Sequence, residues 1–117
     1  FRRVLFRSGT LAGKTMTVGT YGRIIVGTNG ALTLAADTSL TGGAAAYATS
    51  AGASITNQGV ILNNTASSYG DFYAPAFLNE GSISTTLGTI NVGNTGAGYT
   101  TTNAATANST PMATTGR

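Results

Sequence analysis

Cysteine and histidine are both absent from this chain of 117 residues. No disulfide and no thiolate or imidazole metal site can therefore form. The carboxylates that remain as metal ligands are only three, scattered along the chain at Asp37, Asp71 and Glu80. We expect neither a bound metal nor a cofactor.

The same absences argue against catalysis. A serine or threonine nucleophile would depend on Lys14 as its base, and no Ser-x-x-Lys spacing occurs. Asp71 and Glu80 are the one carboxylate pair to consider for glycoside hydrolysis, but such pairs usually stand in clefts lined by aromatic and further polar groups. We expect no enzyme and assign no catalytic residue.

Charge is scarce as well. Only 8% of the residues are charged, against roughly 25% in an ordinary soluble domain, so solubility must come from hydroxyl and amide groups. The net charge is +3, and five of the basic residues lie in the first fifth of the chain: Arg2, Arg3, Arg7, Lys14 and Arg23. This distribution argues against a groove that follows phosphates, with a basic N-terminal arm as the alternative. We expect no nucleic-acid partner, and no membrane span, because no apolar run approaches about 20 residues.

The composition predicts one β domain with two unusual ends. Residues 1–8, FRRVLFRS, lack the apolar stretch of a signal peptide and resemble the translation of a sequencing adapter. We set them aside as an artefact or a disordered arm, with an ordinary strand as the alternative. Residues 9–98 are expected to form the domain. Residues 99–117, rich in threonine, are expected to form a flexible tail or a strand that links to a neighbouring subunit.

Short β-prone runs separated by glycine or asparagine predict an all-β fold. The runs are TMTV, RIIV, ALTLA, GVILNN, GSIS and TINV, and none is long enough for an amphipathic helix. The segment from Gly42 to Ser54 is rich in alanine but has no charged face and is broken by Gly52. We interpret it as a loop, with a short helix as the alternative.

An Asn-x-Gly motif precedes two of these runs. TNQGVIL begins at Thr56 and LNEGSIS begins at Leu78, so that the two asparagines are 22 residues apart. A looser copy, TNGALTL, begins at Thr28. A period in the twenties is typical of stacked one-coil repeats, and we predict a β-solenoid of about five short coils. Its corners would be Asn29, Gly30, Asn57, Gly59, Asn79 and Gly81.

The alternation after each predicted corner indicates which side chains face the core. We expect Val60, Leu62, Ile83, Ile90 and Val92 to point inward. Asn-Gly turns also occur in antiparallel sheets. The alternative fold is therefore an antiparallel β-sandwich of pilin-like or lectin-like type.

The stretches SITNQGVILNN and FLNEGSISTTLGTINVGN resemble coils of large secreted β-helical adhesins, of the filamentous-haemagglutinin and autotransporter-passenger type. The resemblance implies surface adhesion or filament building, with no catalytic residues. We expect an extracellular or cell-surface structural protein whose main partner is itself, as a homopolymer. The alternatives are a carbohydrate-binding sandwich and a pilin-like subunit that donates a strand.

One aromatic cluster, YGDFYAPAF, lies at residues 69–77. Aromatic rings of this kind stack on sugars or fill a core end or a subunit contact. We predict a ligand or subunit contact at Tyr69, Phe72, Tyr73 and Phe77, with surface glycans as the ligand. The motifs NNT at Asn63 and NST at Asn108 match the N-glycosylation acceptor pattern.

Overall fold

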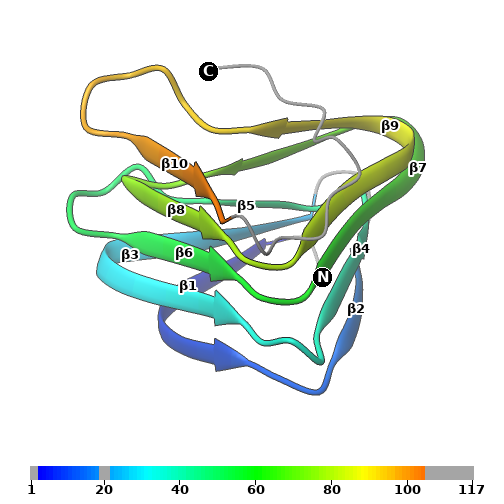
Figure 1. Ribbon diagram of the computed structural model, residues 1–117, viewed down its shortest axis with the longest axis horizontal. Helices are drawn as coiled ribbons and strands as arrows, with labels where there is room; N and C mark the ends of the chain where they lie inside the picture. The colour runs from blue at the N-terminus through cyan, green and yellow to red at the C-terminus, as the bar shows by residue number, and fades with distance from the viewer. Residues whose placement is uncertain (1–2, 19–21, 105–117) are drawn as a thin grey trace.

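The computed structural model describes residues 3–18 and 22–104. All regular structure in these ranges is β-strand (Figure 1). The strands are β1 (Arg3–Leu11), β2 (Thr15–Val18), β3 (Arg23–Leu34), β4 (Ser39–Gly42), β5 (Ala45–Tyr47), β6 (Ser54–Asn57), β7 (Val60–Tyr73), β8 (Ala76–Asn79), β9 (Ser82–Val92) and β10 (Thr100–Asn103).

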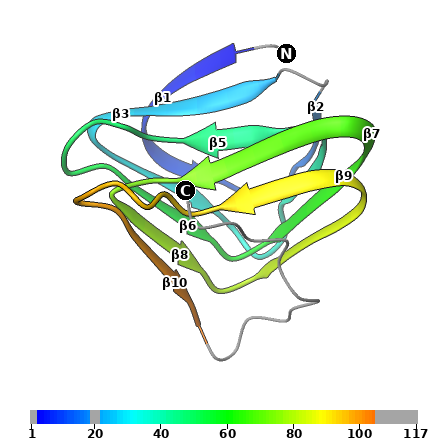
Figure 2. The same cartoon turned by 90° about the horizontal axis from the view of Figure 1, so that it is seen from above.

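These strands form a parallel β-solenoid of about four turns. Each coil passes through three faces. Face A stacks the second half of β1, the second half of β3, β6, β8 and β10. Face B stacks β2, β4 and the first halves of β7 and β9. Face C stacks the first halves of β1 and β3, then β5 and the second halves of β7 and β9 (Figure 2).

The solenoid prediction is thus confirmed, with about four turns in place of about five. The sandwich alternative is wrong, because the strand pairs of the described residues are parallel rather than antiparallel. Strands that follow one another in sequence lie on successive faces, and each pairs with the strand one coil away. This pairing is regular because the coils have nearly the same length. On face A, residues at the same position of successive coils are 22 apart for Asn57 and Asn79 and 24 apart for Asn79 and Asn103.

The alanine-rich segment from Gly42 to Ser54 is an ordinary part of a coil. It contains β5, whose Ala46 is the register partner of Phe72 on the next coil. Residues 48–53 form the loop that leads to β6, in part as predicted, and no helix forms between Gly42 and Ser54. The side chains of Ala46 and Phe72 are both buried. A small alanine beneath a large phenylalanine fills the narrow interior without a steric clash.

The core is a continuous column of inward-facing side chains. Ile83, Ile90 and Val92 are buried as predicted, but Val60 is 40% exposed and Leu62 is half-buried. The prediction for Val60 and Leu62 is wrong by one residue. The Asn57 side chain points inward, and the alternation of inward and outward residues continues through the corner, so that Ile61 points inward and Val60 and Leu62 point outward. Among the described side chains, the buried apolar residues are Val18, Ile24, Val26, Leu32, Leu34, Leu40, Ala44, Ala46, Ala48, Ala53, Ile55, Ile61, Phe72, Ala74, Phe77, Ile83, Ile90 and Val92.

The solenoid extends past both predicted domain limits. Residues 3–8, predicted to be an artefact or a disordered arm with a strand as the alternative, lie in β1, which pairs with β3. Thr100–Asn103, expected to belong to a tail or linking strand, form β10 and pair with β8 of the same chain. Residues 105–117 lie outside the described residues. In the described part of the chain, no helix is long and apolar enough to cross a membrane.

Candidate functional site

A ladder of asparagine side chains runs along one corner of the solenoid. Asn57 Nδ2 donates to Asn79 Oδ1 at 2.8 Å, and Asn79 Nδ2 donates to Asn103 Oδ1 at 2.8 Å. Asn57 and Asn79 are register partners and are both buried. Each buried amide therefore has a hydrogen-bonding partner on the next coil, which a low-dielectric interior requires.

Glycine follows each of these two asparagines by two residues. The Gly59 N–H donates to Asn57 Oδ1 at 3.1 Å, and Asn79 Nδ2 donates to the Gly81 carbonyl oxygen at 3.4 Å. A Cβ added at Gly59 would collide with the Thr38 carbonyl oxygen, and one added at Gly81 would collide with the Gly59 carbonyl oxygen. The Asn-x-Gly motif thus provides a side-chain ladder and a close approach between successive coils.

Asn29 and Gly30 lie at a different corner. The position equivalent to Asn57 on the preceding coil is Leu34, not Asn29. Asn29 has a φ of 58° and lies between faces C and A within β3, where its N–H donates to the Ala51 carbonyl oxygen at 3.1 Å. Treating TNGALTL as a third copy of the motif was therefore wrong.

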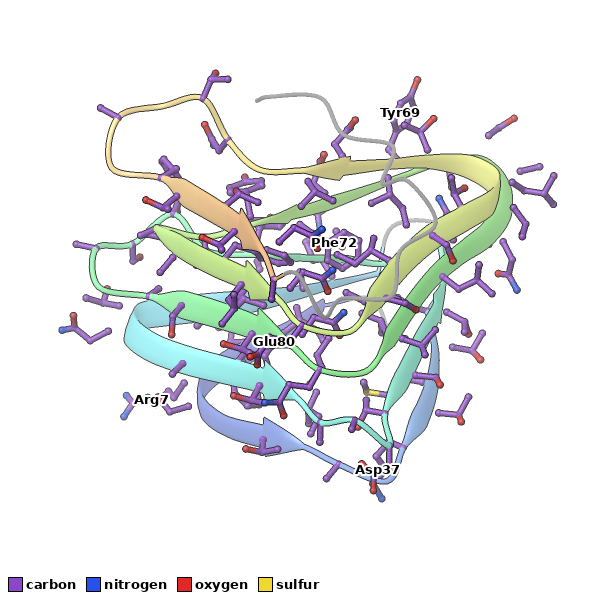
Figure 3. The ribbon with its side chains drawn as sticks, viewed as in Figure 1. Arg7, Asp37, Tyr69, Phe72 and Glu80 are labelled. Carbon is purple, nitrogen blue, oxygen red and sulfur yellow. The ribbon has the colours of Figure 1, made fainter. Side chains whose placement is uncertain are left out.

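The predicted aromatic cluster divides between the interior and the surface. Phe72 and Phe77 are buried in the core. Tyr69 is 68% exposed, and Figure 3 shows it pointing away from the coils while Phe72 points into them. Tyr73 is half-buried. The phenylalanines are therefore unavailable to a ligand, and the prediction of a contact at Phe72 and Phe77 is wrong.

A column of three tyrosines crosses successive coils: Tyr47 and Tyr73 lie on face C, and Tyr99 lies just before β10. Tyr47 and Tyr73 are register partners, and their rings stack with centroids 5.3 Å apart and planes at 19°. Tyr99 meets Tyr73 edge-on, at 5.9 Å and 70°. At the other end of the column, Arg23 Nη1 donates to the Tyr47 hydroxyl at 3.3 Å. These contacts fix the rings in orientation.

Beside this column lies a hollow of about 380 Å³. It is lined by Gly22, Arg23, Gly43, Ala45, Tyr47, Ser67, Ser68, Tyr69, Asp71 and Tyr73. Arg23 is the register partner of Ala45, and continuing the pairing of Ala46 with Phe72 by one residue sets Ala45 opposite Asp71. A guanidinium and a carboxylate therefore flank a position where the middle coil carries only a methyl group.

The turn that precedes Tyr69 is braced from inside. Ser68 Oγ lies 2.7 Å from the Thr65 carbonyl oxygen and 3.0 Å from Asn63 Oδ1, and the Thr65 N–H donates to Asn63 Oδ1 at 3.0 Å. Asn63 Nδ2 donates across to the Thr89 carbonyl oxygen of the next coil at 3.1 Å. Within this turn Ser67 has a φ of 58°, a conformation that a residue with a side chain rarely adopts.

Of the two glycosylation motifs, only one is in the described residues. Asn63 is buried and both ends of its amide are hydrogen-bonded within the protein. A folded chain therefore does not present Asn63 as an acceptor. Asn108 lies outside the described residues.

The acidic residues do not come together. Asp37 Oδ1 accepts a hydrogen bond from the Gly13 N–H at 2.8 Å, Glu80 Oε1 accepts one from Gln58 Nε2 at 3.2 Å, and Asp71 Oδ1 accepts one from Asn91 Nδ2 at 3.2 Å. Across residues 3–18 and 22–104, no group of three acidic side chains is placed to hold a metal ion.

Sequence reasoning identified Tyr69 and Tyr73 but missed Arg23, Tyr47 and Asp71 as neighbours in one hollow. The equal spacing of Tyr47, Tyr73 and Tyr99 along the chain is a signal that was present. Arg23 and Asp71 carried no such signal, because their proximity depends on the register of three coils.

Comparison of the chain with protein-family models, with curated proteins and with solved structures finds no match.

Proposed function

We propose that this chain is an extracellular or cell-surface structural protein whose solenoid associates end to end, building a filament or one segment of an adhesin. The observation that carries the proposal is the open edge of β10. Among the described residues β10 pairs with β8 alone, and β1 and β2 at the opposite end pair only with β3 and β4. Unpaired strand edges are templates for another β-strand.

The direction of the β10 hydrogen bonds identifies the groups at that edge. The Thr100 N–H donates to the Pro75 carbonyl oxygen at 3.0 Å, and the Ala104 N–H donates to the Asn79 carbonyl oxygen at 2.9 Å. Successive backbone amides of a strand point to opposite sides. The N–H and carbonyl groups of Thr101 and Asn103 therefore point away from β8, toward the position of a further coil.

Side chains at this end favour another coil as well. Asn103 accepts the last hydrogen bond of the ladder from Asn79, and its own Nδ2 can serve as donor to a following coil. After Glu80 the described chain has no charged residue. Edge strands that avoid pairing usually carry lysine, proline or inward-facing charge, and the four residues of β10 have none of these.

Substitution at Thr101 tests the proposal. Thr101→Pro removes the outward N–H but no hydrogen bond to β8, and it adds a ring where the next strand would lie. Thr101→Val is the matched control, because it keeps the N–H and the size of the side chain. We expect sedimentation and negative-stain microscopy to show concentration-dependent assemblies for the parent and Thr101→Val, and single particles for Thr101→Pro with the same circular dichroism spectrum.

Two results would contradict the proposal. One is a parent chain that stays monomeric at high protein concentration. The other is equal assembly by Thr101→Pro and Thr101→Val, which would show that the β10 edge is not part of the contact.

The sandwich fold that both alternative functions assumed is replaced by the solenoid, so a carbohydrate-binding sandwich and a pilin-like sandwich subunit are not proposed. Thr100–Asn103, moreover, are already paired with β8 of their own chain and are not a strand held ready for donation. We propose no enzymatic role.

A further inference from the structure

We propose that the hollow on face C is a binding site for one pyranose unit of a neutral glycan. Its volume of about 380 Å³ lies within the roughly 300–1,000 Å³ range of small-ligand pockets. The inference goes beyond end-to-end association and does not depend on it, since the hollow lies on a side face and the association uses the coil ends.

The chemistry of the lining matches a sugar ring. A pyranose has C–H groups on its ring faces and hydroxyl groups around its rim, so it needs an aromatic surface together with hydrogen-bonding groups at the sides. Tyr69 supplies a ring that is 68% exposed. Tyr47 and Tyr73 supply a second wall with phenol hydroxyls, which act as both donors and acceptors.

Two charged side chains line the hollow with opposite hydrogen-bonding roles. Arg23 and Asp71 lie two coils apart with Ala45 between them. The Arg23 guanidinium, which reaches the Tyr47 hydroxyl, donates to one hydroxyl of the ring, and the Asp71 carboxylate accepts from another.

The pair of opposite charges favours a neutral ligand. An acidic sugar would be attracted by Arg23 but repelled by Asp71, and a basic sugar would be attracted by Asp71 but repelled by Arg23. A neutral sugar hydroxyl can accept a hydrogen bond from Arg23 or donate one to Asp71 without either repulsion. A single guanidinium is also too little positive charge for a phosphate chain, which requires several cations along a groove.

The lining is held in place before any ligand arrives. Asn91 Nδ2 donates to Asp71 Oδ1 at 3.2 Å, and a carboxylate has capacity for several further hydrogen bonds. Tyr73 is fixed between Tyr47 and Tyr99. The braced turn from Asn63 to Ser68 fixes the backbone that carries Tyr69. A rigid lining loses little conformational entropy on binding.

The test is a glycan array of neutral oligosaccharides of glucose, galactose, mannose and N-acetylglucosamine, with sialylated oligosaccharides as the acidic comparison. The strongest neutral probe is then titrated into the chain in solution, and tyrosine resonances are followed by NMR. We expect a dissociation constant on the order of 0.1–1 mM for a single-ring site. Tyr69→Ala should weaken binding at least about tenfold, because it removes the stacking surface, and Asp71→Asn should also weaken it.

Val60→Ala is the matched control, since Val60 is also exposed but lies on face B. It should bind as the parent does, and circular dichroism should show the same fold for all variants. The inference is overturned if no neutral probe binds, if the sialylated probes bind more tightly than every neutral one, or if Tyr69→Ala binds as well as Val60→Ala. None of these results bears on assembly, which sedimentation measures separately.

Discussion

Asn57 and Asn79 lie one coil apart and are joined by a hydrogen bond of 2.8 Å between Nδ2 of the first and Oδ1 of the second. Asn79 continues the chain of amides to Asn103, so within residues 3–18 and 22–104 it is the one member of this ladder with an amide partner on both sides. Its removal breaks both of these hydrogen bonds and also the one that Asn79 Nδ2 donates to the Gly81 carbonyl oxygen.

We therefore expect Asn79→Ala to destabilise the fold by about 2–4 kcal/mol, because a buried polar group left without its partner costs about 1–3 kcal/mol. Urea denaturation followed by circular dichroism measures this free energy. Glu80→Ala is the control: Glu80 is exposed and should change stability by no more than about 0.5 kcal/mol. Equal effects of the two substitutions would show that the ladder contributes nothing.

Ile61 and Leu62 form a second matched pair. Ile61 is 1% exposed, whereas Leu62 is half-buried on the outer side of the same strand. Ile61→Ala should cost about 2–5 kcal/mol, and Leu62→Ala clearly less. Thermal melting of both variants distinguishes them, and a larger loss for Leu62→Ala would reverse the assignment of the inner face.

Gly81 and Gly27 test the close packing of coils. A Cβ at Gly81 would overlap the Gly59 backbone, whereas one at Gly27 would lie 3.8 Å from the Phe6 carbonyl oxygen, an ordinary contact. Gly81→Ala should therefore lower the melting temperature strongly, and Gly27→Ala should leave it nearly unchanged. Equal melting temperatures would mean that the corner at Gly81 has room for a methyl group.

Salt should have little effect on the proposed assembly. Screening acts on exposed charges, and the last described coil has no charged residue after Glu80. We expect sedimentation profiles of the assembled chain to be similar at low ionic strength and at 1 M salt. Dissociation at high salt would indicate that the contact is ionic and involves the basic residues near the N-terminus.

The sequence was informative where a coil repeats the same residue type and misleading where it does not. Asn57 and Asn79 were recognisable as a pair, but Leu34 at the same position one coil earlier has no chemical likeness to them. Asn29 resembles them because it precedes a glycine, but it lies at a different corner. The segment from Gly42 to Ser54, predicted to be a loop, contains β5 and is part of a coil.

The inner and outer sides of the strands were misassigned for a related reason. A turn usually restarts the alternation of a strand, but here the inward Asn57 is followed by the inward Gly59 and Ile61.

The hollow on face C was harder still to predict. It needs Arg23, Ala45 and Asp71 to align across three coils, and that alignment is set by the length of every intervening turn.

The braced turn at Asn63 has a consequence for biosynthesis. Asn63-Asn64-Thr65 is an acceptor sequence, yet in the folded chain its amide is enclosed by Ser68, Thr65 and Thr89. In a host that glycosylates such sequences, folding and the transferase compete for one side chain. A sugar attached first would keep the turn open, so the fraction of unmodified Asn63 in the protein purified from such a host records how quickly this part of the solenoid closes.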